Sequence, residues 1–174
     1  MATGSVLLAA NAAVLGDGST DNVPCGMSRR VGSLSGIDNF FLTLDFDGAG
    51  STVESAWWSF RMPADYASGG ALKILWMANG TSNAVKFAAQ VSAITADDAD
   101  TPLEHALSTA ATVTTNVNTT EARRVTASSI TLNMDSAAAG DLIQLVLKRD
   151  PSDGSDTSTA DAEVLACAFE YTTT

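Results

Sequence analysis

Short segments in which apolar and polar residues alternate recur along this chain, separated by clusters of Gly, Asp, Ser and Pro. Side chains of a strand point alternately to opposite faces of its sheet, so this period of two is typical of strands with one buried face. The pattern predicts strands at residues 39–46, 54–62, 71–78, 84–94, 112–117, 123–128, 130–134, 141–149 and 162–171. Asn79-Gly80, between two apolar runs, predicts a hairpin with a loop longer than two residues.

Eight or nine strands without a sustained helical period indicate an all-β protein. Two antiparallel sheets packed face to face bury such strands best, and we expect a jelly-roll topology in preference to an immunoglobulin-like sandwich. One short helix is expected from Pro102 to about Ala110. There, Thr101 and Glu104 have the spacing of a capping box, with Pro at the first helical position.

The length of 174 residues suits one domain. Residues 16–36 are rich in Gly, Ser and Asp and show no periodicity, which predicts a boundary within them. We therefore expect residues 1–36 to form an N-terminal arm or extended segment, and residues 37–174 to form the jelly-roll β-sandwich.

The charge balance excludes several classes of partner. The chain has 20 acidic and 9 basic residues, a net charge of -11, so neither nucleic acid nor an anionic membrane is an expected partner. Only 17% of residues are charged, against roughly 25% on average, so the polar surface must be largely neutral. The apolar stretch at residues 6–15 lacks the basic start of a secretory signal and is too short to span a membrane, which predicts a protein made in the cytoplasm.

The residues for catalysis are scarce. His105 is the single histidine, and a surface or capping role is favoured over that of a catalytic base. The segment at residues 32–36 has Leu at its centre, where a nucleophile elbow needs Ser. Acidic pairs of a glycosidase kind remain a minor alternative, and no phosphate-cradling Gly-rich motif is present. We therefore predict a protein that is not an enzyme and needs no cofactor.

A loop with four carboxylates is a candidate calcium site. Asp150, Asp153, Asp156 and Asp161 could offer oxygen ligands to Ca²⁺, but their spacing does not fit an EF-hand. A soluble turn is the favoured interpretation, with no metal bound, and calcium binding stays open.

Two cysteines, Cys25 and Cys167, lie far apart in the sequence and outside any C-x-x-C pair. Cys167 lies in an apolar run, which favours a free, buried thiol. A disulfide between the two remains possible.

Aromatic residues are the remaining candidates for a contact site. Trp57 and Trp58 are adjacent in a predicted strand, so they must point to opposite faces. One is then core, and the other marks a contact with a subunit or a ligand. Trp57, Trp58 and Tyr66 are the candidate contact residues, with a subunit interface favoured over a glycan site.

Several segments resemble small β-sandwich virion proteins of tailed bacteriophages and related viruses. The resemblance covers roughly residues 40–172 and is carried by WWSFRMPADY at 57–66, AGDLI at 139–143, KRD at 148–150, DAE at 161–163 and FEY at 169–171. It implies a virion structural protein that decorates the outside of a capsid as a homotrimer and contacts the major capsid protein or other virion proteins. A carbohydrate-binding or receptor-binding tail module is the alternative.

Overall fold

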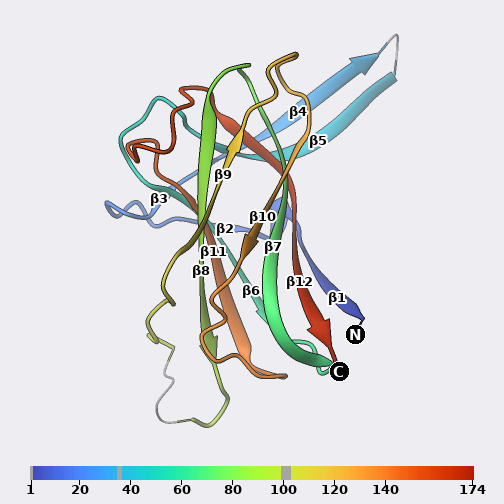
Figure 1. The fold of residues 1–174 in the computed structure, drawn as a ribbon, viewed down its shortest axis with the longest axis vertical. Coiled ribbons are helices and arrows are strands. Elements are labelled where there is room, and N and C mark those ends of the chain that lie inside the picture. Colours follow the sequence, from blue (N-terminus) through green and yellow to red (C-terminus); the bar gives the residue numbers. More distant parts are fainter. Residues whose placement is uncertain (1, 35–36, 99–102) are drawn as a thin grey trace.

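The computed structural model describes residues 2–34, 37–98 and 103–174, and it consists of two six-stranded sheets packed face to face (Figure 1). Sheet A contains β1 (Thr3–Leu8), β4 (Gly26–Leu34), β5 (Ile37–Phe46), β7 (Tyr66–Ala78), β10 (Thr126–Thr131) and β12 (Ala162–Thr173). Sheet B contains β2 (Val14–Leu15), β3 (Val23–Pro24), β6 (Glu54–Arg61), β8 (Ala84–Ile94), β9 (Ala111–Asn116) and β11 (Leu142–Arg149).

The strand order confirms the predicted two-sheet sandwich. Sheet A runs β10-β7-β12-β5-β4, with β1 also paired to β12, and sheet B runs β2-β6-β11-β8-β9, with β3 also paired to β6. Most neighbouring strands are distant in the sequence, as expected of a jelly roll. The named strand pairs are antiparallel, except that β3 pairs with β6 in parallel.

The inward faces of both sheets form one core. Trp76 of sheet A is fully buried and meets Phe87 of sheet B edge to face, with ring centroids 5.5 Å apart. Cys25 and Cys167 are both free and buried, which confirms the free thiol predicted for Cys167. Burial raises the pKa of both thiols to about 12, so both are protonated at neutral pH.

The short helix expected at residues 102–110 is not seen over the described part, residues 103–110; Thr101 and Pro102 lie outside the described residues. Residues 103–104 form a turn and the rest is irregular. Ser108 instead bonds to β8, since its backbone N–H donates to the Val91 carbonyl at 2.7 Å and its hydroxyl accepts from the Val91 N–H at 3.0 Å. Tertiary hydrogen bonds thus replace those of the expected helix, and the helical turn that is present is a 3-10 helix at Ala10–Ala12.

The hairpin predicted at Asn79-Gly80 is also wrong. The strands on either side, β7 and β8, lie in different sheets, so the loop carries the chain across the sandwich. The Asn79 amide donates to Asp161 at 2.9 Å, and the backbone N–H of Asp161 donates back to Asn79 at 3.0 Å. This reciprocal pair holds the crossing against the loop that precedes β12.

The N-terminal segment is integrated into the sandwich and does not lie beside it. β1 pairs with β12, β2 and β3 pair with β6, and β4 pairs with β5. Strands of residues 1–36 therefore belong to both sheets. β2 and β3 contain two residues each, too few to show a period.

Candidate functional site

A hollow on the outer face of sheet B brings one tryptophan together with aliphatic and polar side chains. It has a volume of about 310 Å³, and we call it the Trp57 hollow. It is lined by Val14, Leu15, Asp17, Asn22, Trp57, Ser59 and Gln144. These residues come from β2, the loop that follows it, and the paired strands β6 and β11.

The three aromatic residues singled out in the sequence lie in different environments. Trp57 and Trp58 point to opposite faces of β6 as predicted; Trp58 is 3% exposed, and its indole N–H donates to the Ala9 carbonyl at 2.9 Å. Tyr66 is 8% exposed and packs near Tyr171, with ring centroids 5.8 Å apart. Trp57 alone of the three is half-buried at the surface, so it is the residue able to meet a ligand.

The orientation of the Trp57 indole is fixed by Asn22. The indole N–H donates to the side-chain oxygen of Asn22 at 2.7 Å, and the Ser55 hydroxyl donates to the same oxygen. Trp57 lies opposite Val146 in the register, and Val146 is fully buried although it faces outward. The indole thus has a buried apolar neighbour on the paired strand and is held at its nitrogen.

The loop between β2 and β3 shapes one wall of the hollow. The Asp17 carboxylate accepts hydrogen bonds from the Ser19 backbone N–H at 2.9 Å, the Ser19 hydroxyl at 2.7 Å and the Asn22 amide at 3.1 Å. These donors, the Ser19 backbone first, lower the pKa of Asp17, so the group is ionised at neutral pH. Gly16 lies against Asn22 so closely that a Cβ there would overlap the Asn22 carbonyl oxygen.

Unused polar groups complete the hollow. Ser59 and Gln144 are cross-strand neighbours on β6 and β11, and within the described residues their side chains make no hydrogen bond. The Lys148 ammonium lies over the Trp57 ring, 5.9 Å from its centroid. The site can therefore offer a flat apolar surface together with amide and hydroxyl groups that are free to bond.

The sequence pattern indicated Trp57 but gave no signal for Asp17, Asn22 or Gln144. Asp17 and Asn22 lie within residues 16–36, where a boundary was predicted, and an Asp-Gly pair followed by Ser there is an ordinary turn signal. Gln144 is one polar residue among several on alternating strands. Only the pairing of β2, β6 and β11 brings them together.

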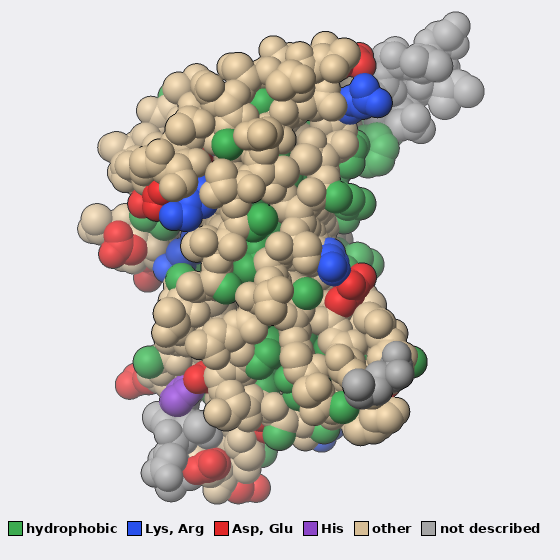
Figure 2. Space-filling model, in the orientation of Figure 1, with side chains coloured by type: hydrophobic (Ala, Val, Ile, Leu, Met, Phe, Trp, Pro, Cys, Tyr) green, Lys and Arg blue, Asp and Glu red, His purple; other side chains and the backbone are tan. Residues whose placement is uncertain are grey.

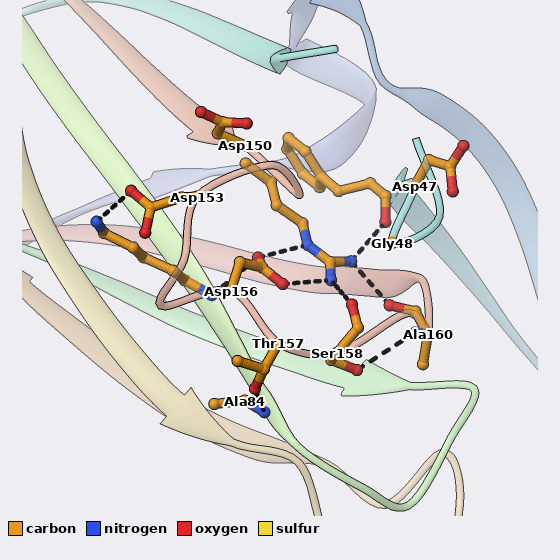
Figure 3. Close-up of polar contacts among 12 residues, drawn as sticks. Asp47, Gly48, Ala84, Asp150, Asp153, Asp156, Thr157, Ser158 and Ala160 are labelled. Carbon is orange, nitrogen blue, oxygen red and sulfur yellow. Dashed lines mark hydrogen bonds and ion pairs between the residues drawn. The ribbon is translucent and has the colours of Figure 1, made fainter. Parts of the chain in front are cut away.

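In the candidate calcium loop, Asp156, Ser158 and Ala160 lie around one guanidinium (Figure 3). The hydrogen bonds identify it as that of Arg149, a residue that is 1% exposed. Its guanidinium donates two hydrogen bonds to the Asp156 carboxylate, at 2.8 and 2.9 Å. It also donates to the backbone carbonyls of Phe46, Ala160 and Ser158, at 3.1, 2.8 and 2.6 Å. Arg149 thereby stands where a cation would have to stand, at the centre of the loop.

The other carboxylates of this loop have partners of their own. Asp153 accepts from the Lys86 ammonium at 2.6 Å, and Asp161 is bonded to Asn79. Asp150 accepts hydrogen bonds from the turn that follows it. In the part of the chain that the structure describes, no three side chains of the metal-ligating types gather. This arrangement fits the structural turn that the sequence favoured.

Within the described residues, the ring of His105 is paired with a carboxylate and not with a serine. Its Nε2 is 3.0 Å from a carboxylate oxygen of Asp135, and the Ser92 hydroxyl donates to its backbone carbonyl and not to its ring. The same Asp135 carboxylate accepts from the backbone N–H of Ala93 at 3.0 Å. The pair therefore ties the segment before β9 and the turn after β10 to the end of β8.

A second hollow, of about 450 Å³, lies on the outer face of sheet A. It is lined by Arg29, Arg30, Val31, Phe41, Met77, Arg123, Val125 and Leu165. Beside it, the fully buried Glu163 carboxylate lies 2.8 Å from Arg30 and 3.6 Å from Arg123. Neither guanidinium is oriented to hydrogen-bond that carboxylate. Arg30 and Arg123 thus neutralise a buried carboxylate.

No protein-family model and no curated protein matches the chain. Among solved structures, it is similar to an isomalto-dextranase from Arthrobacter globiformis in complex with panose (14% identity, TM-score 0.47). The match covers 96% of this chain and 23% of that one. It is also similar to the cleaved adhesin domain of Lys-gingipain from Porphyromonas gingivalis, with 15% identity and a TM-score of 0.46. That match covers 99% of each chain.

A carbohydrate-binding module specific for non-crystalline cellulose has 10% identity and a TM-score of 0.45, over 95% of this chain and 94% of that one. The chain spans about a quarter of the length of the first enzyme named above. These likenesses are too distant to carry an argument about function, which has to come from the site. No helix in the described residues is long and apolar enough to cross a membrane.

Proposed function

We propose that this protein is a non-catalytic carbohydrate-binding module and that the Trp57 hollow holds the sugar. The observation that carries this proposal is the half-buried Trp57 indole, fixed at its nitrogen by Asn22 and flanked by the unbonded side chains of Ser59 and Gln144. This corresponds to the alternative that the sequence left open.

The chemistry of a sugar suits such a hollow. A pyranose ring has an apolar face of C–H groups that stacks on an indole, and hydroxyls at its rim that need hydrogen-bond partners. The Trp57 ring can stack on the C–H face of the sugar. The Gln144 amide can donate hydrogen bonds to the sugar hydroxyls and accept hydrogen bonds from them. Because the Asn22 bond sets the indole in place before binding, little side-chain entropy is lost when a ligand stacks on it.

The test is retention on polysaccharides. Affinity electrophoresis against a panel of neutral soluble glucans, galactans and mannans should show retardation of the wild-type chain on at least one of them. Trp57→Ala should abolish it, and Gln144→Ala should weaken it about tenfold, the effect of roughly one lost hydrogen bond to a bound ligand.

The control is Thr114→Ala, which removes a polar group from an exposed position of β9 in the same sheet. It should leave retention unchanged. Trp58→Ala is unsuitable because Trp58 is part of the core. A wild-type chain that passes every gel unretarded, or a Trp57→Ala variant that is retained like wild type, contradicts the proposal.

A second candidate is a decoration protein on the outside of a viral capsid, assembled as a homotrimer and bound to the major capsid protein. It is supported by the resemblance of residues 40–172 and by large apolar side chains exposed on β4 and β5. The surface in Figure 2, which is mostly neutral, is also suited to packing against other subunits. Binding to capsids emptied of DNA tests it, and a chain that never cosediments with them would exclude this role.

A further inference from the structure

Another hollow lies beside the Trp57 hollow on the outer face of sheet B, over β8, β9 and β11. It has a volume of about 330 Å³, and we call it the Lys148 hollow. Among the residues that line it are Asp21, Ala88, Ala110, Thr112 and Lys148. Its volume is close to the 310 Å³ of the Trp57 hollow, so the two hollows can hold ligand units of the same size.

Two features join the two hollows. Lys148 lines one hollow, and its ammonium lies over the Trp57 ring that lines the other, 5.9 Å from the ring centroid. Asp21 lines the Lys148 hollow, and its neighbour in the chain, Asn22, lines the Trp57 hollow. The hollows are therefore adjacent both at Lys148 and at the loop between β2 and β3, and one extended ligand can enter both.

The strand register gives the direction of such a ligand. Ser55 of β6 lies opposite Lys148 of β11, and Lys148 lies opposite Ala88 of β8. Ala88 in turn lies opposite Thr112 of β9. These residues form a row across four strands, which spans about 14 Å because neighbouring strands are roughly 4.8 Å apart. The Trp57 indole lies at the β6 end of the row, with its nitrogen 3.1 Å from the Ser55 hydroxyl. A ligand along the row crosses the strands from β6 to β9.

The polar groups of the Lys148 hollow suit sugar hydroxyls. Within the described residues, the Lys148 ammonium, the Asp21 carboxylate and the Thr112 hydroxyl make no hydrogen bond or ion pair. The ammonium can donate, the carboxylate can accept and the hydroxyl can do both. Asp150 and Asp153 also line the hollow, but their carboxylates already accept hydrogen bonds. Because the lining contains both signs of charge and no aromatic ring, it suits a neutral unit that is held by hydrogen bonds without stacking.

We propose that the protein binds a chain of at least two sugar units, with one unit on Trp57 and the next in the Lys148 hollow. This inference rests on the proposed function and names the class of its ligand, a neutral sugar chain and not a single terminal sugar. Lys148 contacts both units, because its ammonium has no ion pair and its flexible four-carbon stem lets it turn from the Trp57 ring to a hydroxyl in either hollow.

Calorimetric titration with sugar oligomers of increasing length tests the inference. The probes are glucose, galactose or mannose oligomers of one to six units, made by partial acid hydrolysis of the polysaccharide that retards the wild-type chain. The affinity of the wild type should rise at least about tenfold from one unit to three, because the Lys148 hollow adds hydrogen bonds. Thr112→Val removes one hydroxyl at nearly constant side-chain size. It should weaken binding of the trimer about fivefold and leave binding of the single unit unchanged.

Thr114→Val is the matched control, because Thr114 lies two residues further along β9 and does not line the hollow. It should bind every oligomer like the wild type. Lys148→Met keeps the apolar stem without the ammonium and should weaken binding of the trimer about tenfold.

The outcomes separate this inference from the proposed function. A wild type that binds one unit as tightly as three, or a Thr112→Val variant that binds the trimer like wild type, overturns the inference and leaves sugar binding at Trp57 standing. A wild type that passes every gel unretarded contradicts the proposed function, and the inference falls with it.

Discussion

Two loops of similar composition have opposite roles in this protein. The loop after β11 and the loop between β2 and β3 are both rich in Asp, Ser, Thr and Gly; the first also contains Pro and Ala, and the second Asn. The first closes around the buried side chain of Arg149, which uses its guanidinium on Asp156 and three backbone carbonyls. The second bonds through Asn22 to the edge of Trp57 and leaves that ring at the surface.

The difference lies in what each loop is tied to. A buried guanidinium must be saturated with acceptors, so the loop around it has no freedom left to bind anything else. An indole N–H needs one acceptor only, so the loop that supplies it can leave the rest of the ring open. The first loop therefore stabilises the fold, and the second presents a site.

The largest expected effect concerns the loop after β11, which closes around Arg149. Arg149→Met should lower the free energy of unfolding by about 3–5 kcal/mol, because it leaves the Asp156 carboxylate buried without its cation. Urea denaturation measures this loss. Lys86→Met, at the half-exposed pair with Asp153, should cost much less. Equal losses for the two variants would show that burial does not distinguish the pairs.

A glycine pair compares the backbones of the two loops. Gly16→Ala should cost about 1–3 kcal/mol, because its Cβ would overlap the Asn22 carbonyl oxygen and displace the wall of the Trp57 hollow. Gly154→Ala in the other loop meets open space and should stay within about 0.5 kcal/mol of wild type. The same denaturation experiment measures both. If Gly16→Ala left the free energy of unfolding unchanged, this wall of the hollow could shift without cost.

The bond between Asn22 and Trp57 gives a smaller effect. Asn22→Ala should cost about 1–2 kcal/mol, because the Trp57 N–H then retains only the Ser55 hydroxyl, 3.1 Å away. Asn22→Asp keeps the acceptor for the indole but sets a second carboxylate against Asp17, so the double variant Asp17→Asn/Asn22→Asp, which removes that repulsion, should lose less than Asn22→Ala. Tryptophan fluorescence and urea midpoints check both variants, and identical behaviour of the two would show that Asn22 does not hold the ring.

The smallest effect is a pH dependence of stability that comes from the loop between β2 and β3. The pKa of Asp17 is lower in the folded chain than in the unfolded one, since the Ser19 and Asn22 donors favour its carboxylate. Its contribution to stability is therefore present above about pH 4, the unfolded value, and is lost as the pH falls through the lower folded pKa. Asp17→Asn should flatten the dependence of the urea midpoint on pH below 4. An unchanged slope would contradict this role.

Strong alternation made much of the fold predictable. The prediction of residues 84–94 matches β8, and those of residues 54–62, 141–149 and 162–171 fall within two residues of β6, β11 and β12. β2 and β3 were not predicted, because strands of two residues are too short to show an alternating pattern. The prediction of a helix up to Ala110 failed for another reason. Hydrogen bonds between Ser108 and β8 outweighed the local capping signals.

The candidate site was predictable only in part. Adjacent tryptophans in a strand must point to opposite faces, but the sequence does not say which of the two is core. That choice depends on which face of β6 meets sheet A, and it places Trp58 inside and Trp57 outside. Asn22 and Gln144 reach Trp57 through strand pairing over long separations in sequence, which no local pattern encodes.

The sequence by itself determined the sandwich, its main strands and the neutral character of its surface, because alternation and composition are local properties of the chain. Only the tertiary structure decided which apolar residues became core. Phe40 and Leu42 share the alternation of Leu44 and Phe46, yet β5 extends past the body and leaves the first two open. Burial depends on what lies across from a residue, and that is settled when the two sheets pack.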